Sequence, residues 1–146
     1  MNTDLVVVVG AGLMGQGIAQ CAAQAGYRVR LWGLNAAELE RAMKNTAESA
    51  AKLHAKGRIA DASEAVLARI TPVLDLEQCA GGDICIETVV EELQVKQGIF
   101  RALERLARPT AILASNTSTI PIGKIAAATS CPERCLGMHF TSPVPL

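Results

Sequence analysis

The chain has 146 residues, the size of one ordinary domain, and half of them are apolar while only 3% are aromatic. These proportions predict a full core built from aliphatic side chains. Fourteen basic residues balance fourteen acidic ones, and this near-zero net charge argues against nucleic acid or an anionic membrane as a partner.

Short apolar runs alternate along the chain with longer stretches of helical periodicity. The apolar runs predict strands at residues 5–9, 27–32, 70–73, 84–87, 111–114 and 135–140. The intervening stretches predict helices at residues 14–25, 36–56, 62–68, 94–107 and 122–128. This alternation predicts an α/β protein with a doubly wound, mainly parallel sheet and helices on both faces, in a single domain.

A G-x-G-x-x-G motif at residues 10–15 lies between the first predicted strand and the first predicted helix. In this context Gly10 allows a tight turn, Gly12 lets a pyrophosphate approach the backbone, and Gly15 lets the helix pack closely on the strand. The pyrophosphate would lie on the free N–H groups of the helix start. The motif predicts a Rossmann-type fold with a dinucleotide at Gly10, Gly12, Leu13, Met14 and Gly15.

The same fingerprint expects an acid at the end of the second strand, where it binds the adenine ribose. This chain has Gly33 at that position. The loss should weaken NAD binding and its discrimination against NADP, unless Asn35 or main-chain groups compensate. No arginine directly follows the strand, so we expect NAD to be the cofactor.

Three further motifs carry a family resemblance: ETVVEELQVK at residues 87–96, ASNTS at 114–118 and GMHF at 137–140. Together with the glycine motif, they make the chain closely resemble the NAD-binding domain of the L-3-hydroxyacyl-CoA dehydrogenases. The resemblance runs from Leu5 to Leu146. It implies an enzyme of fatty acid metabolism that oxidises the 3-hydroxyl of a hydroxyacyl-CoA thioester to the 3-keto form.

The resemblance also implies roles for four residues near the reacting atoms. His139 matches the catalytic base, a task that suits a histidine because its pKa lies near neutral pH. Ser118 matches the serine that holds the substrate hydroxyl near the nicotinamide, and Glu91 and Lys96 match cofactor contacts. On the residues alone, a structural histidine, a loop serine and a solvated ion pair are the alternatives.

Ser49 and Lys56 match family contacts to coenzyme A. They lie seven residues apart on one predicted helix, which places them two turns apart on one face. A lysine there could meet a phosphate or a pantetheine oxygen. Without the resemblance, both residues would be read as an ordinary polar helix surface.

Two features depart from the family near the C-terminus. Ser142 stands where the family has an asparagine that contacts the cofactor, so we expect a weaker contact there. In the family, a glutamate that pairs with the histidine and a helical dimerisation domain follow the Pro-Val-Pro segment, whereas this chain ends at Leu146. We therefore expect residues 1–146 to be a Rossmann domain, incomplete at its C-terminal end, of a longer enzyme that is homo-oligomeric.

Two other functions stay open at this stage. The substrate could be a hydroxyacyl group on a carrier protein or a free hydroxy acid, or the chain could be a non-catalytic dinucleotide-binding module. We expect the isolated chain to bind dinucleotide weakly and to turn over little substrate.

The N-terminus has no basic start, long apolar run or cleavage site of a signal peptide, and no apolar stretch reaches the roughly 18 residues that span a bilayer. Five scattered cysteines are expected to be free thiols in a cytoplasmic protein. Cys131, Cys135 and His139 lack the spacing of a usual zinc site, so no metal is expected.

Overall fold

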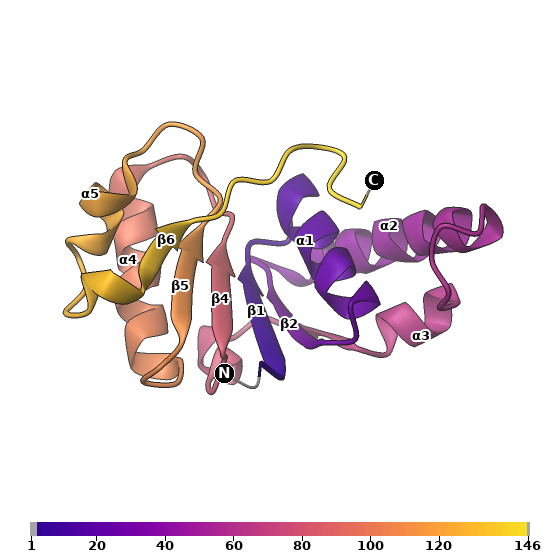
Figure 1. Cartoon of the computed structure of the whole chain (residues 1–146), viewed down its shortest axis with the longest axis horizontal. Coiled ribbons are helices and arrows are strands. Elements are labelled where there is room, and N and C mark those ends of the chain that lie inside the picture. The colour runs from indigo at the N-terminus through magenta and orange to yellow at the C-terminus, as the bar shows by residue number, and fades with distance from the viewer. Residues whose placement is uncertain (1–2, 146) are drawn as a thin grey trace.

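Six parallel strands form one sheet at the centre of the computed structural model, which describes residues 3–145 (Figure 1). The strands are β1 (Leu5–Val9), β2 (Arg28–Trp32), β3 (Ile70–Val73), β4 (Ile84–Glu87), β5 (Ile112–Ser115) and β6 (Cys135–Gly137). Their order across the sheet is β3-β2-β1-β4-β5-β6. The chain reverses its direction of winding between β1 and β4, and ligands bind at the carboxyl ends of the strands at such a switch point. The predicted fold class is confirmed.

Helices cover both faces of this sheet (Figure 1). The α-helices are α1 (Leu13–Gln24), α2 (Ala36–Ala55), α3 (Ser63–Leu67), α4 (Leu93–Leu106) and α5 (Ile122–Ala126), and short 3-10 turns occupy η1 (Leu76–Cys79) and η2 (Pro132–Arg134). The first three helices pack on one face, and α4 and α5 pack on the other. None of the described helices is both long and apolar enough to cross a membrane.

Alternate residues of β1 supply two separate cores. Val6 and Val8 face the layer of α1, α2 and α3, whereas Val7 and Val9 face α4 and α5. All four side chains are almost fully buried, because a parallel strand in the middle of such a sheet is covered on both sides. The run of valines is therefore explained by burial on two faces, and it places the glycine turn directly at the carboxyl end of the central strand.

The last strand is shorter than predicted. β6 ends at Gly137 rather than at residue 140, because its only neighbour, β5, ends at Ser115, the partner of Gly137. One more main-chain hydrogen bond, from Met138 to Ser115, closes the ladder. The following segment runs from β6 across to α1 (Figure 1), where Val144 packs against Gly17. The chain leaves the sheet just before His139, so this histidine lies on a loop at the carboxyl edge.

Candidate active site

The glycine turn between β1 and α1 is closely packed at Gly10 and Gly15. Gly10 has a φ of 114°, which favours glycine, and its amide donates to the carbonyl of Trp32 at 2.9 Å. A Cβ on Gly15 would lie 1.7 Å from the carbonyl oxygen of Gly10. At the N-cap of α1, Gly12 brings no side chain to cap the helix. The first amides of α1 therefore have no side-chain cap, which is the arrangement that a phosphate site at a helix start requires.

A cavity of ≈ 420 Å³ opens beside this turn. Its wall is mostly apolar, and its lining residues are Gly10, Gly12, Trp32, Leu34, Glu38, Thr88, Val89, Val90, Val95 and Ile99. Phosphate-binding amides on one side and apolar side chains on the other suit the two parts of an adenosine diphosphate. The residues present therefore fit a dinucleotide.

Ser118 and His139 lie together at the carboxyl edge of the sheet. The Ser118 Oγ and the His139 Nε2 are 3.0 Å apart, within hydrogen-bond distance, and both residues are exposed. Ser118 follows β5 and His139 follows β6, so adjacent parallel strands bring them to one place. Asn116 holds the second loop, because its Oδ1 accepts a hydrogen bond from the Phe140 amide at 2.7 Å. A hydroxyl and an imidazole thus face solvent as a pair.

Glu91 anchors the loop that carries Ser118. Its Oε1 accepts hydrogen bonds from the Ser118 amide at 3.1 Å, from the amide and hydroxyl of Thr119 at 3.2 and 3.1 Å, and from the hydroxyl of Thr117. Desolvation raises the pKa of this carboxyl, but the hydrogen bonds from Thr117, Lys96 and Thr119 outweigh it and lower the pKa to about 2. Glu91 is therefore ionised at neutral pH.

Lys96 lies inside the protein rather than on its surface. Its side chain is 1% exposed, and its Nζ lies 2.8 Å from Glu87 Oε1 and 3.2 Å from Glu91 Oε2. Glu87, at the end of β4, is fully buried and also accepts from Ser115 Oγ at 2.7 Å and from the Val89 amide at 2.6 Å. A buried carboxylate needs such partners. The network ties the ends of β4 and β5 to the start of α4.

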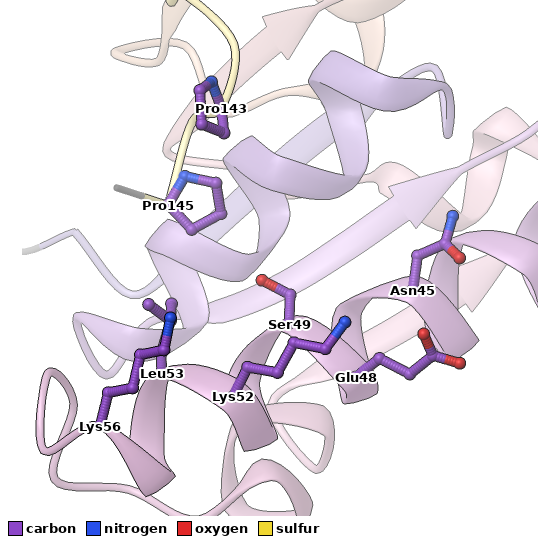
Figure 2. Close-up of a pocket in the computed structure, with 8 residues that line it drawn as sticks. All are labelled: Asn45, Glu48, Ser49, Lys52, Leu53, Lys56, Pro143 and Pro145. Carbon is purple, nitrogen blue, oxygen red and sulfur yellow. The ribbon is translucent and has the colours of Figure 1, made fainter.

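The predicted coenzyme A residues share a second cavity, of ≈ 370 Å³, between α2 and the C-terminal segment (Figure 2). Ser49 and Lys52 of α2 line it together with Lys56, the residue after the helix end, and Pro143 and Pro145 lie opposite. Two ammonium groups and the carboxylate of Glu48 line this cavity, so its net charge is positive. Lys52 completes this pair and was missed from the sequence, although its spacing from Lys56 is one helical turn.

Ser142 lines a smaller cavity of ≈ 190 Å³ together with Leu13, Gly17 and Gln20 of α1. The structure thus brings this residue beside the first turn of the helix that carries the glycine motif. Met14 lies in the same turn and is half-buried. The cofactor residues predicted from the sequence therefore fall along one edge of the sheet.

Several residues that shape the site were not singled out from the sequence. Asn116, Thr117 and Thr119 lie within or beside the ASNTS motif and hold its loop, and Glu87 opens the motif at residues 87–96. Their motifs indicated the region but not the roles, because the roles depend on contacts between β4, β5 and β6.

Cys131 contacts Glu104 and Arg134, and the described residues contain no group of three metal-binding side chains.

The sheet order, the glycine turn and the adjoining cavity define a dinucleotide-binding α/β domain, and the serine–histidine pair lies at the same carboxyl edge of its sheet. Residues 5–146 match the sequence model of the 3-hydroxyacyl-CoA dehydrogenase NAD-binding domain. The chain belongs to this family, whose cofactor is NAD.

Three relatives illustrate the match. A probable 3-hydroxybutyryl-CoA dehydrogenase of Deinococcus radiodurans is 45% identical over 139 residues, which are 95% of this chain and 50% of the relative. A probable 3-hydroxybutyryl-CoA dehydrogenase of Bacillus subtilis is 41% identical over 147 residues, which cover 100% of this chain and 51% of that relative. The crystal structure of 3-hydroxybutyryl-CoA dehydrogenase from Escherichia coli K12 is similar with a TM-score of 0.94 at 37% identity, covering 100% of this chain and 31% of that one. The chain spans about half the length of these two curated relatives.

Proposed function

We propose that the protein oxidises the 3-hydroxyl of a 3-hydroxyacyl-CoA thioester to a ketone, with NAD as the hydride acceptor. The observation that carries this proposal is the Ser118–His139 pair, 3.0 Å apart at the same carboxyl edge of the sheet as the glycine turn. The names of the relatives support a short chain, 3-hydroxybutyryl-CoA, as the first substrate to test.

In this proposal His139 Nε2 is the general base. The neutral imidazole accepts the proton of the substrate hydroxyl as the C3–H bond breaks, and the C–O bond becomes a carbonyl. Bound NAD supplies the acceptor for the hydride that leaves C3. Ser118 Oγ, next to Nε2, holds the substrate oxygen by a hydrogen bond and so orients the C3–H bond.

Glu91 and Lys96 are proposed to serve the nicotinamide half of the cofactor in different ways. The Glu91 side chain is 39% exposed and can reach a ligand while it holds the Ser118 loop. Lys96 is buried and acts on the cofactor site through Glu91. Ser142, which lines a cavity with Leu13, is proposed to make a weaker contact to the cofactor than the asparagine of the family, because its side chain is shorter and has no amide.

The cavity on α2 is proposed to receive coenzyme A. Ser49 and Lys56 would contact it there, and Lys52 adds a second cation for its phosphates. Ser118 would meet the acyl end of the same molecule. The two positions are consistent with a long, narrow ligand that lies along the C-terminal segment.

We further propose that residues 1–146 act as the Rossmann half of a homo-oligomeric cytoplasmic enzyme. The coverage of about half of each relative supports the first part of this proposal. Five free cysteines fit a reducing compartment. These parts of the proposal are independent of the chemistry at His139.

The test joins residues 1–146 to the other half of the Deinococcus radiodurans relative and measures NADH formed from 3-hydroxybutyryl-CoA. Active turnover that falls about 10²–10⁴-fold in His139→Gln, with NAD affinity unchanged, is the expected result. Unchanged turnover in that variant would refute the role of the histidine. A chimera that binds NAD but is inactive on every thioester would support a non-catalytic module instead.

A further inference from the structure

The position where the family fingerprint has its ribose-binding acid is closed in this chain. Gly33 follows β2 and is buried. A Cβ built there would lie 2.8 Å from Leu39 Cγ and 3.2 Å from Ala11 Cβ, so Leu39 would have to shift to admit a side chain. Residue 33 therefore offers the ribose no side-chain acceptor.

A carboxylate from α2 lies almost at the same place. Glu38 Oε2 accepts a hydrogen bond at 2.8 Å from the amide of Leu34, the residue directly after Gly33. Asn35 Oδ1 in turn accepts from the Glu38 amide at 2.9 Å, so this pair of hydrogen bonds resembles a capping box in which the carboxylate reaches the amide of Leu34 instead of that of Asn35. These two hydrogen bonds fix the half-buried Glu38 side chain near the end of β2, although Glu38 lies five positions after Gly33 in the sequence.

The carboxylate is also part of the dinucleotide cavity. Glu38 lines it together with Gly10, Gly12 and Trp32. A carboxylate has about four lone-pair positions, and Leu34 uses one of them, so Oε1 can accept from two ribose hydroxyls. Asn35 is the neutral alternative, but its Oδ1 is engaged in capping α2.

The charges around the cavity also favour NAD over NADP. Among the described residues that line it, Glu38 is the one charged side chain. The arginines of β2 are held elsewhere: Arg28 pairs with Asp4, and Arg30 donates to main-chain carbonyls near η1. A 2′-phosphate would meet this carboxylate, and no described residue that lines the cavity is a cation that could balance the two charges.

We propose that Glu38 takes over the task of the missing acid, binds the adenine ribose hydroxyls and selects NAD against NADP. This inference rests on the proposed function, because it requires a dinucleotide in the cavity. It makes the second helix, rather than the strand end, the source of cofactor specificity in this chain.

The experiment titrates NAD and NADP separately into the 146-residue chain and into Glu38→Gln. Trp32, the sole tryptophan, lines the cavity and reports binding by its fluorescence. Glutamine keeps an oxygen for the Leu34 amide and removes the charge, so the cap of α2 is retained. Glu40→Gln on the exposed side of the same helix removes an equal charge away from the cavity and serves as the matched control.

The expected result is a preference for NAD over NADP that falls about tenfold or more in Glu38→Gln, while Glu40→Gln keeps the preference of the unaltered chain. The thermal unfolding midpoint of Glu38→Gln should stay within the range of the control. An unchanged preference in Glu38→Gln would overturn the inference while leaving NAD binding in place. Failure of the unaltered chain to bind either dinucleotide would refute the proposed function itself, and the inference with it.

Discussion

Replacing Lys96 by methionine tests whether the buried network holds this edge of the sheet together. The change removes an ammonium that lies 2.8 Å from the fully buried carboxylate of Glu87. Glu87 would keep its hydrogen bonds from Ser115 and Val89 but lose its cation. Breaking one side of a buried ion pair typically costs ~3–5 kcal/mol. That is a large share of the ~5–15 kcal/mol that stabilises an ordinary domain.

The assay is urea unfolding followed by far-ultraviolet circular dichroism, with the slope on denaturant checked for a two-state transition. Arg105→Met on the same helix is the control, because Arg105 and Glu77 are 3.8 Å apart and both largely exposed. That pair should contribute less than about 1 kcal/mol. The double variant Glu87→Gln/Lys96→Met should regain part of the lost stability, since no buried charge is left unpaired. A loss of under about 1 kcal/mol in Lys96→Met would refute this account of the network.

Three other predictions address the loop, the turn and a thiol. Glu91 has a folded-state pKa of about 2, below the ordinary value of 4.5, so its contribution to stability is complete above about pH 4.5 and is lost as the pH falls toward 2. The difference in unfolding free energy between the unaltered chain and Glu91→Gln should shrink over this range, and a difference independent of pH would contradict the role of the carboxylate. Gly15→Ala should abolish NAD binding in fluorescence titrations and destabilise the fold, because its Cβ would strike the Gly10 carbonyl oxygen; Gly98→Ala, which meets no neighbouring atom, is the control, and retained NAD binding in Gly15→Ala would show that the turn can yield. Burial raises the pKa of the Cys85 thiol to about 12, so iodoacetamide at pH 8 should label it only after unfolding in urea, as mass spectrometry of the labelled peptide would show; labelling in the folded chain would mean that β4 opens readily.

The fold was largely predictable because each strand and helix carries its own local signal. The run of valines indicates a buried strand, and the periodicity of residues 94–107 indicates a helix with one apolar face. In the structure, β1 and α4 pack against each other in one core. The end of β6 was not predictable in this way. The apolar run continues to Phe140, and only the length of β5 determines where pairing stops.

The site was predictable as a set of motifs but not as a set of contacts. Ser118 and His139 were expected near strand ends, and the sheet order brings them to 3.0 Å. The burial of Lys96 could not be predicted from the sequence, because a lysine near a helix start is ordinarily exposed. Its burial depends on a carboxylate from β4, and no spacing along the chain signals that contact. Glu38 is a second case, since its position beside Leu34 follows from a capping pair that also serves the helix.

The Ser118–His139 pair is exposed, yet residues outside the pair set its geometry. Glu91 binds the loop of Ser118 at three successive residues, and Asn116 binds the main chain next to His139. Lys96 connects this arrangement to the interior, because it touches both Glu91 and the buried Glu87. Stability and the proposed proton transfer should therefore be coupled at this edge of the sheet. A substitution at Lys96 should lower the unfolding free energy and also loosen the loop on which the 3.0 Å distance depends, whereas a substitution at His139 should change the chemistry alone.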